Sequence, residues 1–191
     1  MTTLSADKPA TSKKDTTKKA SKTSMTSKHD YKTGDFVVYP AHGVGQIVGI
    51  ETQSVAGIDI ELYVIAFEQE KMTLRVPTSK AKAAGMRGLA STDVISSALK
   101  TLKGRARIKR VMWSRRAQEY EAKINSGNLV QVAEVVRDLH RNADQPEQSY
   151  SERQLYETAL DRMARELAAA ENTDRDAAVA KLSKTLTKVA S

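Results

Sequence analysis

Eight basic residues and the only tryptophan of the chain lie within nineteen positions near its middle, from Lys100 to Gln118. No acidic residue interrupts this segment, which has the sequence KTLKGRARIKRVMWSRRAQ. Basic side chains at this density pair with the phosphates of a polyanion, and a large aromatic ring beside them can press against an unstacked base. The pattern therefore favours contact with nucleic acid, best where the duplex is already open. The competing interpretation is an ordinary solvated helix end or linker.

The position of the tryptophan relative to the next helix leaves two interpretations open. Trp113, Tyr120 and Ile124 recur at helical spacing, which is typical of an apolar stripe buried in a core. Alternatively, Ser114 caps a helix that begins after the tryptophan. Arg115 and Arg116 would then lie in the first helical turn, where free backbone N–H groups and guanidinium groups both attract phosphate. The second interpretation exposes Trp113 as a wedge.

The rest of the sequence offers little that could catalyse a reaction. The three histidines have no second ligand at metal-binding spacing, and the chain has no cysteine. The glycines at 43 and 45 lack the further glycine and the Lys-Ser/Thr of a phosphate loop. We therefore expect a protein that is not an enzyme, with no metal, no cofactor and no small-molecule substrate.

The elements that carry these residues fall into two groups. From Tyr31 the apolar pattern has period two and predicts short strands at 35–39, 46–55, 58–67 and 72–76. Four or five such strands make a small, strongly bent sheet or barrel of SH3 or Tudor type, with exposed edges that a partner strand could pair with.

Beyond residue 88 the pattern is helical. It predicts helices at 92–102, from 108 or 113 to 125, at 128–141, from a capping box at Ser151, and from about 173. The expected fold class is α+β multidomain: a disordered basic tail (1–30), a small SH3/Tudor-like β domain (31–88) and a compact helical bundle of about five helices (89–191).

Four segments resemble the CarD/CdnL family of bacterial transcription regulators. They are GDFVVYPAHG (34–43), TLRVP (73–77), WSRR (113–116) and QVAEVVRDL (131–139). Their order and spacing match the family over about residues 31–170. The first two also resemble the polymerase-binding module of the transcription-repair coupling factor.

The resemblance implies that the β domain is an RNA polymerase-interaction domain that binds the β subunit, partly by pairing through an edge strand. Arg75 and Pro77 match the polymerase-contacting strand of the family. Gln53 stands where some members have a polymerase-contacting arginine, so neighbours such as Val55 are expected to supply that contact.

By the same resemblance, the helical domain binds promoter DNA at the upstream edge of the transcription bubble. Trp113 matches a minor-groove wedge, and Arg115 and Arg116 match the basic residues that follow it. Gln118 stands where some members have a DNA-contacting lysine. The residues expected to compensate are Lys109, Arg110 and Arg107.

The function expected from this resemblance is a transcription regulator that stabilises the open complex at initiation. We expect a cytoplasmic monomer with no membrane partner, since no apolar run approaches the length of a membrane span. Two alternatives stay open. One is an architectural DNA-binding protein that acts without polymerase, and the other is an adaptor whose basic segment faces an acidic protein.

Overall fold

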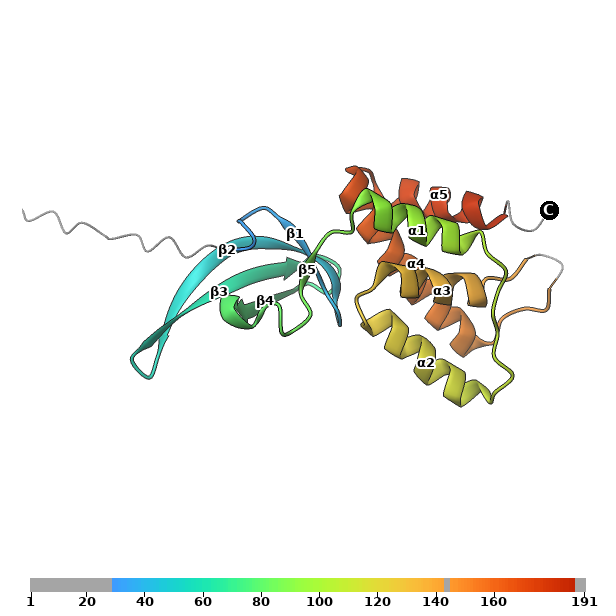
Figure 1. Cartoon of the computed structure of the whole chain (residues 1–191), viewed down its shortest axis with the longest axis horizontal. Coiled ribbons are helices and arrows are strands. Elements are labelled where there is room, and N and C mark those ends of the chain that lie inside the picture. Colours follow the sequence, from blue (N-terminus) through green and yellow to red (C-terminus); the bar gives the residue numbers. More distant parts are fainter. Residues whose placement is uncertain (1–28, 143–144, 188–191) are drawn as a thin grey trace, which may run out of the picture.

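The structure, a computed structural model, describes residues 29–142 and 145–187 and consists of an N-terminal β domain packed end to end against a helical domain (Figure 1). The predicted class, a small β domain followed by a helical region, is confirmed. The expected disordered tail lies, up to residue 28, outside the described residues. Its last position, Asp30, forms an ion pair of 3.1 Å with Lys82.

The β domain is one antiparallel sheet of five strands in the order β4-β3-β2-β1-β5. The strands are β1 (Phe36–Tyr39), β2 (Gly43–Val55), β3 (Ile58–Phe67), β4 (Met72–Pro77) and β5 (Arg87–Gly88). The sheet is strongly curved (Figure 1), and the register of β2 against β3 shifts between Ile47 and Gly49. The strand order leaves β4 and β5 as the two edges.

The alternating pattern of β3 separates an inner from an outer face of the sheet, as the sequence predicts. Tyr63, Ile65 and Phe67 point inward and are almost completely buried. Leu62 and Val64 lie on the outer face, where they too are buried, at 8% and 6% exposed. At the tip of the β2–β3 hairpin, Ala56 and Gly57 both have positive φ, at 52° and 80°, as expected for a two-residue hairpin turn that follows the twist of the strands.

In the described residues, five helices form the C-terminal domain, around an apolar core. They are α1 (Thr92–Leu102), α2 (Trp113–Asn125), α3 (Leu129–Leu139), α4 (Tyr150–Glu171) and α5 (Arg175–Thr187). Asn128 caps α3 as predicted, with Oδ1 accepting from the N–H of Val130 at 2.9 Å. The capping box of α4 is formed by Ser149 and Glu152, two residues before the predicted one. None of the helices in the described ranges is long and apolar enough to cross a membrane.

Three charged residues join the two domains, and we call Arg87, Arg162 and Glu166 the interdomain joint. Arg87 of β5 pairs with both carboxylate oxygens of Glu166 on α4, at 2.5 and 2.9 Å. Glu166 is only 4% exposed and also accepts the backbone N–H of Ala90 at 3.0 Å. A buried bidentate pair of this kind holds its partners in one geometry.

Arg162 completes the interdomain joint by donating to backbone carbonyls. Its guanidinium donates to Pro40 O at 2.9 Å and Ala41 O at 2.5 Å in the β1–β2 turn, and to Ile124 O at 3.2 Å at the end of α2. Burial lowers the pKa of Arg162. One side chain of α4 therefore connects the β domain to the helix that begins at Trp113.

Candidate functional site

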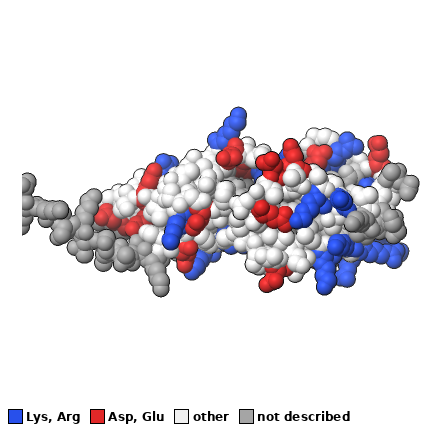
Figure 2. Space-filling view, turned by 90° about the horizontal axis from the view of Figure 1, so that it is seen from above, with Lys and Arg blue, Asp and Glu red and all other residues white. Residues whose placement is uncertain are grey.

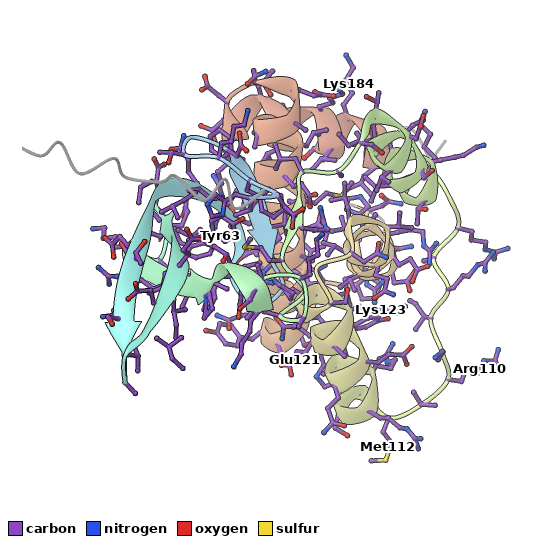
Figure 3. The ribbon with its side chains drawn as sticks, turned by 60° about the vertical axis from the view of Figure 1, so that its left-hand side comes forward. Tyr63, Arg110, Met112, Glu121, Lys123 and Lys184 are labelled. Atoms are coloured by element: carbon purple, nitrogen blue, oxygen red, sulfur yellow. The ribbon has the colours of Figure 1, made fainter. Side chains whose placement is uncertain are left out.

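The basic segment forms the outer end of the helical domain. Residues 103–112 link α1 to α2 without regular structure, and Arg110 and Met112 project from this loop away from the helices (Figure 3). In the face of the molecule that Figure 2 shows, Lys and Arg side chains gather at the helical end, whereas acidic and basic groups mix elsewhere. The cationic surface expected from the sequence is therefore present in the folded protein.

A buried carboxylate fixes the path of this loop. Asp138 of α3 is 3% exposed and accepts the backbone N–H of Arg107 at 2.9 Å. The neighbouring Arg137 balances its charge, with Nε and Nη2 at 2.8 and 2.7 Å from Oδ1. Sequence reasoning missed Asp138. Its signal was an acidic residue beside Leu139 on the apolar side of a helix, where a buried carboxylate must have partners.

The predicted DNA-binding cations differ in how they are paired. Lys109 donates to Glu119 at 2.6 Å, and this hydrogen bond is the main cause of the lowered pKa of Glu119. Among the described residues, no carboxylate forms an ion pair with Arg107, Arg110 or Arg115, and all three are exposed. These three arginines are therefore available for phosphate, whereas Lys109 must first leave Glu119.

Trp113 fits neither sequence interpretation completely. The predicted cap at Ser114 is wrong: Met112 is the N-cap and Trp113 is the first residue of α2. The indole is half-buried and packs against the helical core, with its ring centroid 6.5 Å from that of Tyr120. The guanidinium of Arg116 lies over the ring, 5.3 Å from its centroid, within cation–π range. The core and Arg116 thus hold the ring, which keeps an accessible part.

The residues predicted to bind polymerase lie together on the outer face of the sheet. Arg75 is opposite Val64 and Pro77 is opposite Leu62, which is itself opposite Glu51. Gln53 and Val55 follow on the same face of β2, because they lie two and four residues beyond Glu51. One continuous face and the β4 edge therefore carry all four predicted residues.

This outer face combines an exchangeable charge with exposed apolar groups. Arg75 Nε donates to Glu51 Oε2 at 3.0 Å, and both side chains are about half exposed, at 55% and 53%. Such surface pairs contribute about 0–1 kcal/mol, so Arg75 can change partners at small cost. Val55 and Ile58, directly opposite each other near the hairpin tip, are 51% and 67% exposed. These features suit a protein partner.

The described residues contain no group of three or more His, Cys, Asp or Glu placed to hold a metal ion. His42 Nδ1 lies 2.7 Å from Glu70 Oε2, and His140 Nδ1 lies 3.0 Å from the hydroxyl of Tyr156. The ring of His42 also lies against those of Tyr39 and Phe67, and His140 also has a hydrogen bond with Asn142.

Two families of known domains match the chain. Residues 31–90 match the CarD-like/TRCF RID domain, and residues 97–183 match the C-terminal domain of CarD. A relative from Bacillus subtilis strain 168, named "Putative transcription factor YdeB", is 28% identical over 137 residues, which cover 72% of this chain and 90% of the relative. The boundary between the two matched regions coincides with the start of α1.

Proposed function

The chain belongs to the CarD-like family, and from this premise we propose that it is a transcription factor that connects RNA polymerase to promoter DNA and slows the closing of the transcription bubble. In this proposal the β domain binds the polymerase β subunit. The loop at 103–112 and the start of α2 bind DNA at the upstream edge of the bubble. The protein works without catalysing a reaction.

The observation that carries this proposal is the placement of two dissimilar surfaces at opposite ends of one molecule. The β2–β3 hairpin and the outer sheet face lie at one end, and the cationic loop before α2 lies at the other (Figure 1). The interdomain joint connects them through α4. Exposed apolar side chains at the hairpin tip, at the end away from the cationic loop, favour a second partner that is not DNA.

The DNA contact proposed here is weak by itself. Arg107, Arg110 and Arg115 with one or two further cations would neutralise about four phosphates, which gives a log–log salt dependence of affinity of roughly −3 to −4. A second attachment through polymerase raises the effective concentration of the loop near the DNA. The polymerase contact therefore supplies the localisation, and the loop supplies the effect on the bubble.

The test measures the lifetime of the open complex on a slowly opening promoter, with and without the full-length protein. We expect the protein to prolong this lifetime, and Trp113→Ala or Arg110→Ala to reduce the effect. Lys184→Ala is the matched control, because Lys184 is an exposed cation on α5 at the other side of the helical domain (Figure 3). An unchanged lifetime with the wild-type protein would refute the proposal.

A second measurement separates the alternatives. Binding to the isolated polymerase β subunit should weaken in Arg75→Ala and be unaffected in Lys80→Ala, an exposed cation just beyond β4. Tight binding to bare duplex without polymerase would instead favour an architectural DNA-binding protein. Normal promoter activity after Arg110 and Arg115 are both changed to alanine would favour a protein adaptor.

A further inference from the structure

A pocket of about 290 Å³ lies at the corner where the outer face of the sheet meets the helical domain, and both domains line it. Phe36, Gln46 and Ala66 contribute from β1, β2 and β3. Ala169 of α4 and Arg175 of α5 contribute from the helical domain, where the turn between these helices lies at the end nearest the β domain (Figure 1). We call this cavity the interdomain pocket.

The interdomain pocket continues the face of the sheet that carries Arg75. On that face Gln46 is opposite Ala66, and Ala66 is opposite Thr73. Ala66 lies two residues beyond Val64 on the same side of β3, and Val64 is opposite Arg75. Two residues of a strand span about 7 Å. The interdomain pocket therefore begins one row of outward-facing residues away from Arg75.

A protein bound around Arg75 would reach this pocket because of its size. Each side of a specific protein–protein interface buries about 800 Å², which corresponds to a patch of roughly 16 Å radius. A patch of that radius centred on Arg75 extends past Ala66. On the other side of the pocket it meets α4 and α5. The helical domain then becomes part of the same contact.

The apolar lining of the interdomain pocket suits a side chain of a protein. Phe36 is 41% exposed, and Ala66 and Ala169 are half-buried beside it. Pockets for whole drug-sized ligands begin at about 300 Å³ and bury most of the ligand, so a cavity of 290 Å³ between two domains is better matched to one or two side chains. Anchor residues of protein interfaces fill pockets of this kind.

Charges of both signs surround the apolar lining. Arg165 and Arg175, from α4 and α5, both pair with Asp161. Glu68 and Glu70 line the pocket from the turn after β3. A protein segment with an acidic and a basic residue beside its apolar side chain is complementary to this arrangement. A polyanion such as DNA is not, because the two glutamates repel it.

We propose that the protein partner of the outer face inserts an apolar side chain into the interdomain pocket and so contacts both domains at once. This inference rests on the proposed function, in which that partner is the polymerase β subunit, and it adds the helical domain to the contact. A partner seated there touches β1 and β3 on one side and α4 and α5 on the other. Its binding therefore also reinforces the interdomain joint.

The first experiment measures the affinity of the full-length protein for complete RNA polymerase. Phe36→Ala should weaken binding about three- to eightfold, the effect of no longer burying the two fifths of the ring that are exposed in the free protein. Tyr150→Ala is the matched control, because Tyr150 is an aromatic residue on α4 that is 79% exposed and does not line this pocket. Its affinity should equal that of wild type.

A second variant fills the pocket and removes nothing. Ala169→Leu places a larger apolar side chain where the partner's side chain would sit, so binding should weaken about tenfold. Ala180→Leu, at an exposed position on α5 outside the pocket, is its control. Leucine is a good helix former, so both proteins should unfold thermally like wild type. If Phe36→Ala does not fold, Ala169→Leu decides.

The outcomes separate this inference from the proposed function. Weaker binding of Arg75→Ala, together with wild-type binding of Ala169→Leu, would overturn the inference and leave the proposed function intact. A wild-type protein without measurable affinity for polymerase would refute the proposed function itself. Equal losses in Ala169→Leu and Ala180→Leu would also overturn the inference, because the effect would then not come from the pocket.

A crosslinking experiment identifies what enters the pocket, and it uses the absence of cysteine from the sequence. Ala169→Cys and Gln53→Cys each give a single thiol that can carry a photoreactive benzophenone, and Ala180→Cys gives the control. In the complex with polymerase and promoter DNA, we expect the labels at 169 and 53 to crosslink to the same subunit and the label at 180 to none. Crosslinks from 169 to DNA, to a different subunit or to nothing would contradict a single partner that spans both domains.

Discussion

Replacing Glu166 by glutamine should weaken the interdomain joint more than any change to a surface ion pair. The carboxylate of Glu166 accepts from Arg87 Nη1, Arg87 Nη2 and the N–H of Ala90. The glutamine amide keeps one acceptor oxygen. Its N–H₂ group takes the place of Glu166 Oε2, which accepts from Arg87 Nη2 at 2.9 Å in the wild type. One charge-assisted hydrogen bond becomes a contact between two donors, and the others become weaker.

The expected cost is about 2–3 kcal/mol of unfolding free energy. Removing one member of a fully buried ion pair costs about 3–5 kcal/mol, because the other charge is left buried. The side chain of Arg87 is 33% exposed and that of Glu166 is 5% exposed, so water can reach the arginine and the cost falls at or below the lower end of that range. Urea denaturation at neutral pH measures the change.

Glu171→Gln on the same helix is the control for this prediction. Glu171 pairs with Lys181 at 2.6 Å, but both side chains are partly exposed, at 33% and 46%. The loss there should be below about 1 kcal/mol. Equal destabilisation by Glu166→Gln and Glu171→Gln would show that burial adds nothing to the Arg87–Glu166 pair, and the reasoning about the interdomain joint would be wrong.

Three further changes test other parts of the structure. Asn128→Ala removes the oxygen that caps α3 and should cost about 1 kcal/mol in urea denaturation. Gly45→Ala would place a Cβ 2.7 Å from Ile65 Cγ2 and Phe67 Cε1 in the core of the sheet, and should cost about 1–3 kcal/mol. Burial lowers the pKa of His140 from its ordinary value of 6.5, outweighing the opposing hydrogen bond with Asn142. The unfolded state therefore binds the proton more tightly, so the wild type should lose stability as pH falls below about 6.5, and His140→Gln should lose less.

Each of these three has an outcome that would contradict it. A cost of Asn128→Ser similar to that of the alanine would argue against the capping role, since serine is also a good cap. An unchanged unfolding midpoint in Gly45→Ala would mean that the sheet core is not tightly packed there. Parallel pH profiles of unfolding free energy for wild type and His140→Gln would mean that the burial of His140 does not penalise its charged form.

The sequence predicted the strands well because the local signals agree with one another. Apolar and polar residues alternate strictly from Ile58 to Leu62, and a turn residue without a side chain, Gly57, stands where the hairpin needs positive φ. The outer face follows from this alternation alone. For the same reason the side-by-side placement of Arg75 and Pro77 on one face could be predicted before their cross-strand partners were known.

The sequence left the start of α2 open among residue 108, residue 113 and a cap at Ser114, and the structure begins the helix at Trp113. Ser114 is a good cap and Met112 offers no side-chain acceptor, yet the helix begins after Met112. The packing of Trp113 against the core and Tyr120 outweighs the roughly 1 kcal/mol that a serine cap contributes. The capping box of α4 illustrates a related limit, because Ser149 with Glu152 and Ser151 with Gln154 both fit the pattern.

The interdomain joint had no visible signal in the sequence. Arg162 donates to carbonyl oxygens more than a hundred positions earlier in the chain, and every residue type carries a carbonyl. Arg87 and Glu166 are 79 positions apart, and nothing in either neighbourhood marks them as a pair. Such contacts depend on how the domains meet, which periodicity and composition do not encode.

The two ends of the molecule are connected through α4 and the interdomain joint, and not through a flexible linker. In the structure, α4 and the interdomain joint set the separation between the sheet surface and the loop at 103–112. Under the proposed function, the response of a promoter would depend partly on where melting stops relative to the polymerase. Under the same proposal, shifting the point where melting stops by a single base pair should change the response of the promoter to the protein, whatever the DNA sequence there.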